Sequence, residues 1–130
     1  MPKQALEQII MDSVGEILRL RFNPGSGSVR GDADLSPKDL ISDFPLQLGF
    51  ECKDHAVKSH SVNAADWKKA KVQIKGRNLD PIFVTRNKEL EIMVHMELPL
   101  FKNLIEQIID NYEESTYRYE MSKTISSSVE

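Results

Sequence analysis

One stretch of the sequence decides the fold: Leu46-Gln47-Leu48-Gly49-Phe50-Glu51-Cys52-Lys53. It is mostly apolar, has the length of a buried strand, and ends in a carboxylate and an ammonium group two residues apart. Because side chains alternate between the two faces of a strand, Glu51 and Lys53 should share one face while Cys52 points to the other. Charges at the end of a buried strand are costly unless they are paired or used, so this pair is the first candidate for a functional site.

The composition limits the class of protein. A chain of 130 residues has the length of one domain with a core, and 40% hydrophobic and 28% charged residues are typical of globular proteins. No stretch approaches the roughly 20 apolar residues of a membrane span, so no membrane partner is expected. The N-terminal residues lack the pattern of a secretion signal, and the single cysteine cannot form an intramolecular disulfide. A cytoplasmic protein is therefore expected.

The net charge of −3 at pH 7 argues mildly against a general nucleic-acid coat protein, because such proteins are usually basic. It does not exclude a nuclease, since a local basic surface can lie on an acidic chain. Carboxylates that bind magnesium also contribute negative charge that the bound ion would cancel.

Hydrophobic spacing predicts three helices. Apolar residues recur at steps of three and four in the ranges 3–20, 64–75 and 99–112. Asn63 or Ser61 is expected to cap the second helix. Residues 113–130 become increasingly polar and are expected to form a partly disordered tail, separate from the domain formed by residues 1–112.

Strands are predicted in the ranges 32–35, 46–53, 81–86 and 90–96. The first two should pair as an antiparallel hairpin with a long connection. Residues 21–31 are rich in glycine and serine and indicate a loop, and Ser36-Pro37 indicates a turn. The order helix, strands, helix, strands, helix predicts an α/β domain with a central mixed sheet flanked by helices.

The first helix carries two glutamates that differ in angular position. At about 100° per residue, Glu7 falls in line with Val14 and Leu18 on the inward side, and Glu16 falls on the opposite side. A glutamate that faces inward is unusual, so Glu7 is a candidate for function and Glu16 is expected to face solvent.

These residues suit the hydrolysis of a phosphodiester. Magnesium prefers oxygen ligands, and a bound ion would hold the phosphate, activate water and neutralise developing charge. Asp32 and Glu51 supply carboxylates, to which Glu7 adds a third, and the backbone carbonyl of Cys52 is a further possible ligand. Lys53 beside them would orient the attacking water or stabilise the charged transition state.

Four short motifs carry a family resemblance. They are Gly25-Ser26-Gly27-Ser28, Gly31-Asp32, Phe44-Pro45 and Phe50-Glu51-Cys52-Lys53. Together they resemble the PD-(D/E)xK nucleases, and most closely the archaeal-type Holliday junction resolvases and their bacteriophage relatives. The resemblance continues through Trp67 and the strand predicted at 81–85, so it covers roughly residues 1–97.

The resemblance implies a restriction-endonuclease-like fold and cleavage of DNA with Mg²⁺, for which Mn²⁺ would substitute. The family's functional residues fall on Glu7, Asp32 and Glu51 as metal ligands, Lys53 as the catalytic lysine, and Ser26 or Ser28 as the loop serine. It also implies a homodimer whose two sites cut opposing strands of a four-way junction. The expected location is the cytoplasm of a bacterial cell, in association with the nucleoid, and the gene is expected to come from a bacterium or a bacteriophage.

The sequence departs from the family pattern in the first acidic motif. Gly31 stands where the motif has a proline, and the link from Asp32 to Glu51 is longer than in the short resolvases. Asp34 would share a strand face with Asp32 and is an equally suitable ligand. The choice between the two aspartates stays open at this point.

Basic and hydroxyl side chains are the candidates for contacts with DNA phosphates. They are Ser26, Ser28, Arg30, Lys58, Lys68, Lys71 and Lys75. Trp67 is expected in the core rather than as a stacking platform, and His55 and His60 are expected to be ordinary loop residues.

The sequence therefore predicts a magnesium-dependent endonuclease, with a Holliday junction resolvase as the favoured activity. Two alternatives remain. One is a related nuclease that acts on linear, flapped or nicked DNA, and the other is a non-catalytic DNA-binding protein on the same scaffold.

Overall fold

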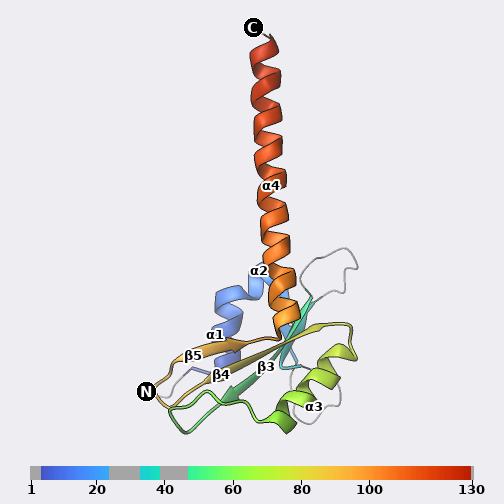
Figure 1. Cartoon of the computed structure of the whole chain (residues 1–130). Coiled ribbons are helices and arrows are strands. Elements are labelled where there is room, and N and C mark those ends of the chain that lie inside the picture. Colours follow the sequence, from blue (N-terminus) through green and yellow to red (C-terminus); the bar gives the residue numbers. More distant parts are fainter. Residues whose placement is uncertain (1–3, 24–32, 39–46, 130) are drawn as a thin grey trace. The chain divides into compact units, whose positions relative to one another are not determined.

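The computed structural model describes residues 4–23, 33–38 and 47–129, with side chains described as far as Thr124. The chain divides into two compact units, Met1–Met96 and Glu97–Glu130. The first unit contains a mixed sheet and the helices that flank it, and the second is a single helix (Figure 1). The predicted α/β class with a mixed sheet and flanking helices is confirmed.

The described part of the first unit contains one five-stranded sheet in the order β1-β2-β3-β4-β5. The strands are β1 (Leu20–Phe22), β2 (Leu35–Pro37), β3 (Leu48–Asp54), β4 (Asp80–Arg86) and β5 (Ile92–His95). β3 and β4 are parallel, and the other neighbours are antiparallel. The predicted antiparallel pairing upstream of the central strand is present, with Leu35 opposite Phe50.

β3 is the centre of the sheet, as its apolar sequence predicted. Leu48, Gly49 and Phe50 are buried, and the strand pairs with β2 on one edge and β4 on the other. A Cβ atom at Gly49 would lie 2.7 Å from Cγ2 of Ile74, so the glycine allows the helix over this face to pack closely against the strand.

The N-terminal helix is nearly continuous but irregular. It consists of α1 (Leu6–Ile10), a π-helical turn η1 (Met11–Gly15) and α2 (Glu16–Leu18). Arg19 then adopts a left-handed conformation, with φ of 54°, which ends the helix. The helix predicted at 3–20 is therefore confirmed over most of its length.

Two short strands were not predicted where they occur. Residues 20–22 form β1, although 21–31 was expected to be loop, and Ser36-Pro37 lies in β2, although a turn was expected. Leu20 is buried and pairs with Pro37, and the backbone N–H of Lys38 donates to the carbonyl of Arg19. Burial and pairing across the sheet outweigh the local turn preference of the Ser-Pro sequence.

Helix α3 (Ala64–Lys75) has the predicted bounds and the predicted cap. The side chain of Asn63 accepts hydrogen bonds from the backbone N–H groups of Ala65 and Asp66. The helix buries Ala70 and Ile74 in a cluster with Ala33, Leu79 and Phe83, against which Val62 and Trp67 pack. The prediction of Trp67 as a packing residue is confirmed, because its ring lies 5.9 Å from that of Phe83.

The second unit is helix α4 (Leu98–Val129), which spans 32 residues. The expected end of this helix at Tyr112 is wrong, because the helix continues through the residues that were expected to form a polar tail. Among the described residues, no helix combines the length and the apolar character that crossing a membrane requires.

Candidate functional site

Glu51 and Lys53 lie on the same face at the C-terminal end of β3. Lys53 Nζ is 3.8 Å from Glu51 Oε1, and the two side chains are 20% and 48% exposed, in the order Glu51 and Lys53. Cys52 between them is buried on the other face. The alternation predicted from the sequence is confirmed.

Asp34 approaches the same end of β3 from the neighbouring edge. Its Oδ2 accepts a hydrogen bond of 2.8 Å from the backbone N–H of Cys52. The N–H and C=O groups of one strand residue point to the same edge, so the carbonyl of Cys52 also leaves the strand on the side of Asp34. The role of that carbonyl as a metal ligand stays a prediction.

Glu7 reaches the site from α1. Its side chain is partly buried, whereas Glu16 is exposed, as the helical phase predicted. One carboxylate oxygen from Glu7, one from Asp34 and the sulfur of Cys52 all lie within 4.8 Å of one another. Because Cys52 and Glu51 face opposite sides of β3, Glu7 and Glu51 approach its end from opposite sides of the sheet.

The electrostatics of the site favour neutralisation of Glu51. Burial raises the pKa of Glu51 to about 7, and the nearby carboxylates of Asp34 and Glu7 also raise it, against the lowering effect of Lys53 and Lys69. Burial also raises the pKa of the Cys52 thiol, with Asp34 as the next cause. That thiol stays protonated at neutral pH, so the atoms of the cluster that are available to bind a metal ion are the carboxylate and carbonyl oxygens.

This donor set suits a hard divalent cation. Carboxylate oxygens of Glu7 and Asp34 lie close together on the Cys52 side of β3, whereas Glu51 lies on the other face, and Mg²⁺ and Mn²⁺ bind carboxylate oxygens. The mutual repulsion that raises the pKa of Glu51 is the repulsion that a bound cation would relieve. The oxygens of Glu7 and Asp34 are of the type that Mg²⁺ binds, and the magnesium site stays a prediction.

Four predicted site residues lie outside the described residues: Ser26, Ser28, Arg30 and Asp32. Of the two aspartates that the sequence left as alternatives, Asp34 is the one described, and it lies in the cluster.

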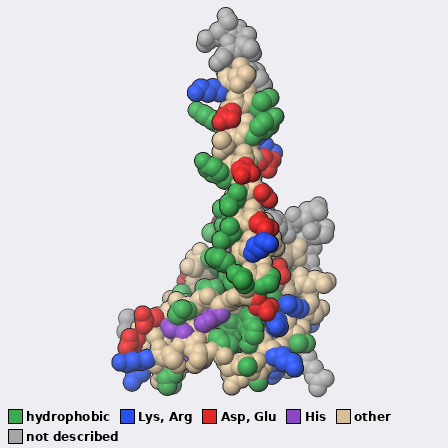
Figure 2. All heavy atoms as spheres, viewed as in Figure 1, with side chains coloured by type: hydrophobic (Ala, Val, Ile, Leu, Met, Phe, Trp, Pro, Cys, Tyr) green, Lys and Arg blue, Asp and Glu red, His purple; other side chains and the backbone are tan. Residues whose placement is uncertain are grey.

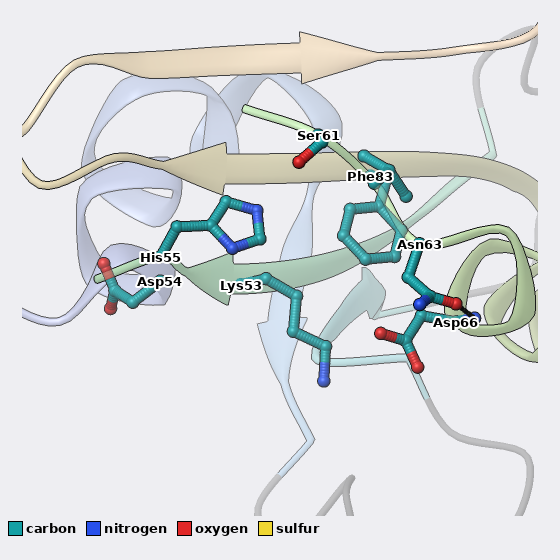
Figure 3. A pocket seen from close by; sticks show the side chains of 8 residues that line it. Lys53, Asp54, His55, Ser61, Asn63, Asp66 and Phe83 are labelled. Atoms are coloured by element: carbon teal, nitrogen blue, oxygen red, sulfur yellow. Dashed lines mark hydrogen bonds between the residues drawn. The ribbon is translucent and has the colours of Figure 1, made fainter. Parts of the chain in front are cut away.

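A cavity of about 360 Å³ adjoins Lys53. It is lined by Lys53, Asp54, His55, Ser61, Val62, Asn63, Asp66 and Phe83. Figure 3 shows Lys53 between His55 on one side and the start of α3, with Asn63 and Asp66, on the other. The lysine thus lies beside a space that could admit part of a substrate.

The sequence missed an ion pair between a buried guanidinium and an exposed carboxylate, Arg86 and Asp54. The guanidinium of Arg86 is almost fully buried and donates to both carboxylate oxygens of Asp54, at 2.6 and 2.9 Å. Its third hydrogen bond, of 2.7 Å, goes to the carbonyl of Gln4 just before α1. Arg86 therefore ties the end of β3 to the start of the helix that carries Glu7. No local pattern indicated this contact, because the partners are far apart in sequence.

The sequence also missed a histidine cluster around Thr85. The hydroxyl of Thr85 lies 2.8 Å from Nδ1 of His60 and 2.8 Å from Nε2 of His95. His55 lies close enough to His95 to help lower its pKa, after burial and His60, and its Nε2 atom is buried without a hydrogen-bond partner in the described structure. Histidine side chains accordingly gather together in Figure 2. His60 was expected to be an ordinary loop residue, but it takes part in this network.

The predicted DNA-contacting lysines lie on exposed or partly exposed surface. Lys58 is exposed and forms a surface ion pair with Glu89 at 3.5 Å. Lys68 and Lys75 on α3 are exposed, and Lys71 is partly buried. Among the lysines of α3, Lys69 is the one that acts on Glu51. The predicted DNA-contacting lysines of α3 therefore belong to the same helix as Lys69, whose charge reaches Glu51.

Comparison of the chain with protein-family models, with curated proteins and with solved structures found no significant match to any of them.

Proposed function

We propose that this protein is a magnesium-dependent endonuclease that hydrolyses DNA phosphodiesters. The observation that carries the proposal is the raised pKa of Glu51, about 7, at a strand end where Asp34 and Glu7 add carboxylates and Lys53 lies 3.8 Å away. A strongly perturbed carboxylate beside other acids and a lysine is typical of sites that bind cations and perform acid–base chemistry.

In the proposed site, the carboxylates of Glu7, Asp34 and Glu51 and the carbonyl of Cys52 would hold the metal. When bound, Mg²⁺ supplies positive charge to the scissile phosphate and increases the acidity of water. Asp34 takes the role that the sequence prediction assigned to Asp32, for which Asp34 was the alternative.

Lys53 orients the attacking water and stabilises negative charge on the phosphate. The attacking water gives up a proton to solvent as its oxygen forms a bond to phosphorus. The bond from phosphorus to one sugar oxygen breaks, and that oxygen leaves with its electron pair and takes up a proton from solvent. The position of Lys53 beside the cavity supports this role, because the lysine borders both the carboxylates and open space.

The lysines of α3 contact the phosphates that flank the cleaved one, together with Lys58 and the loop residues Ser26, Ser28 and Arg30. This assignment is supported by the exposure of Lys68 and Lys75 on the helix that borders the site. The restriction-endonuclease-like fold, the preference for a four-way junction and the homodimer rest on the sequence resemblance, and the mixed sheet with flanking helices is compatible with that fold.

The direct test is cleavage of a synthetic four-way junction with and without magnesium, by the wild type, Lys53→Ala and Lys58→Ala. Loss of Lys53 should reduce the cleavage rate by at least about 100-fold, because the lysine acts in the transition state. Lys58→Ala removes one of several proposed phosphate contacts away from the cleaved bond and should lower the rate by less than about tenfold.

Calorimetric titration with Mg²⁺ and Mn²⁺ completes the experiment. Metal binding that Glu51→Gln abolishes is the expected result. Equal inactivity of wild type and Lys53→Ala, together with no metal binding, would refute the enzyme and favour the DNA-binding alternative. Equal cleavage of junction, flap and linear duplex would replace the resolvase with a nuclease of broader substrate range.

A further inference from the structure

Helix α4 carries an apolar stripe along much of its length. Apolar residues recur at alternating steps of three and four at Leu98, Phe101, Ile105, Ile108 and Tyr112, and Tyr119 continues the series after Ser115. This spacing is the heptad pattern in which two helices pack side chains into each other's surface. Figure 2 shows hydrophobic side chains following the helix.

Charged side chains that flank the stripe form ion pairs with residues on the outer face of α4. Lys102 pairs with Glu106 at 3.8 Å, and Arg118 pairs with Glu114 one turn away. An amphipathic helix of this kind gains most of its stability by burying its apolar stripe. The stripe itself is open in the structure, with Leu98 75%, Ile108 67% and Tyr112 71% exposed.

The exposed area matches what a stable interface needs. Aromatic side chains bury about 150 to 250 Å² each, and leucine and isoleucine somewhat less. At the exposures found along the stripe, with Ile109 beside it, α4 presents roughly 800 Å² of apolar surface. Each partner in a standard protein interface contributes about that area.

We propose that α4 pairs with α4 of a second copy of this chain, in parallel and in register, as a two-stranded coiled coil along Leu98–Tyr119. In-register pairing sets each apolar layer against itself, which gives five consecutive apolar layers from Leu98 to Tyr112. It also sets Glu97 of one copy, at the position before Leu98, across from Lys102 of the other, so opposite charges flank the first layers.

The seam ends after Tyr119. The next residues in the seam and at its flank are Ser122 and Lys123, which are polar. Arg118 and Lys123 would also oppose each other across the pair, but Arg118 is neutralised by Glu114 in its own helix. The pairing therefore depends on the part of the helix from Leu98 to Tyr112. It involves α4 alone and does not depend on the nuclease function.

The test measures the mass of the full-length chain by analytical ultracentrifugation. The wild type should be a dimer at micromolar concentration. Ile105→Asp combined with Ile108→Asp puts two charges into the seam and should weaken the dimer by at least about 100-fold. The matched control, Asn103→Asp with Gln107→Asp, adds the same charges to the opposite face and should leave the dimer unchanged. A monomeric wild type, or equal weakening by both variants, would overturn the proposal.

A second measurement, disulfide cross-linking, tests the register of the two α4 helices with substitutions that do not disrupt the apolar stripe. Ser115→Cys lies in the seam and should form a disulfide-linked dimer under mild oxidation, because in-register pairing brings each residue 115 against its copy. Asp110→Cys lies on the outer face and should react much more slowly. Equal rates would overturn the proposal. A dimer that does not cleave DNA would refute the proposed function and leave this pairing intact. Cleavage of DNA by a monomeric wild type would refute this pairing and leave the proposed hydrolysis of DNA intact.

Discussion

Two carboxylates on β3, three residues apart, lie in opposite electrostatic environments. Asp54 accepts two hydrogen bonds from the buried guanidinium of Arg86, at 2.6 and 2.9 Å. Glu51 has an ammonium group at 3.8 Å, and its pKa is raised by burial and by the carboxylates of Asp34 and Glu7. The Asp54 carboxylate is matched by a cation of the protein itself, whereas the Glu51 carboxylate lies among like charges, where we propose that a cation from solution binds.

The difference separates a structural charge from a functional one. The pair between the buried Arg86 guanidinium and Asp54 holds the end of β3 against the start of α1, so its loss should destabilise the fold. A cluster of like charges costs stability in the absence of a cation, so its removal should stabilise the fold and abolish function. The same chemical change, from carboxylate to amide, should therefore have opposite effects at the two positions.

The largest expected effect is on cleavage. Asp34→Asn should lower the rate of junction cleavage by at least about 100-fold, because it removes a carboxylate from the metal site. Asp54→Asn, compared at equal concentration of folded protein, should stay within about tenfold of the wild type. A quenched single-turnover assay measures both rates. If Asp32→Asn is severely impaired and Asp34→Asn is active, Asp32 holds the metal instead.

The next effect is on stability. Asp54→Asn should lower the free energy of unfolding by about 3 kcal/mol, because the buried guanidinium of Arg86 loses its charged partner. Lys58→Ala breaks the exposed pair with Glu89 and should change that free energy by less than about 0.5 kcal/mol. Urea unfolding of the metal-free protein measures both. Similar losses in the two variants would mean that burial of Arg86 is not what makes its pair important.

Removal of the Glu51 carboxylate should raise the free energy of unfolding, whereas removal of the Asp54 carboxylate should lower it. Its pKa is about 7 in the folded protein against an ordinary value of 4.5, so the folded state binds the proton more tightly. The contribution of this group is therefore favourable at low pH and is lost as pH rises through 7. In metal-free buffer above pH 7, Glu51→Gln should be more stable than the wild type by on the order of 2 kcal/mol.

Added magnesium should raise the melting temperature of the wild type above pH 7 and much less near pH 5, and it should not affect Glu51→Gln. Thermal unfolding over this pH range, with Glu16→Gln as a matched change on the exposed side of the helix, measures the effect. A destabilised Glu51→Gln variant would mean that the Glu51 carboxylate is paired as Asp54 is.

The smallest effect concerns the ammonium group beside Glu51. Lys53 lowers the pKa of Glu51, so Lys53→Met should raise it further and move the pH dependence of stability to higher pH. Asp34→Asn should move it in the other direction, because Asp34 raises the pKa. NMR titration of the Glu51 carboxyl carbon reads both shifts. Shifts in the same direction would contradict the placement of the two charges.

The sequence alone determined the parts of this protein that depend on local pattern. Apolar runs and helical spacing located β3, β4, α3 and most of the N-terminal helix, because periodic burial leaves a periodic sequence. Strand alternation and helical phase singled out Glu51, Lys53 and Glu7, since both follow from backbone geometry. Asn63 was identified as a cap because few side chains can accept hydrogen bonds from a helix start.

Only the tertiary structure decided the rest. β1 and β2 form because Leu20 and Leu35 are buried in the sheet, against the turn preference of their surroundings. The hydrogen bond from Cys52 to Asp34 brings Asp34 next to β3, and the Arg86–Asp54 pair joins residues 32 positions apart. The raised pKa of Glu51 likewise depends on burial and on charges from three separate elements. Such long-range contacts depend on how distant segments meet, and neither spacing nor composition encodes that meeting.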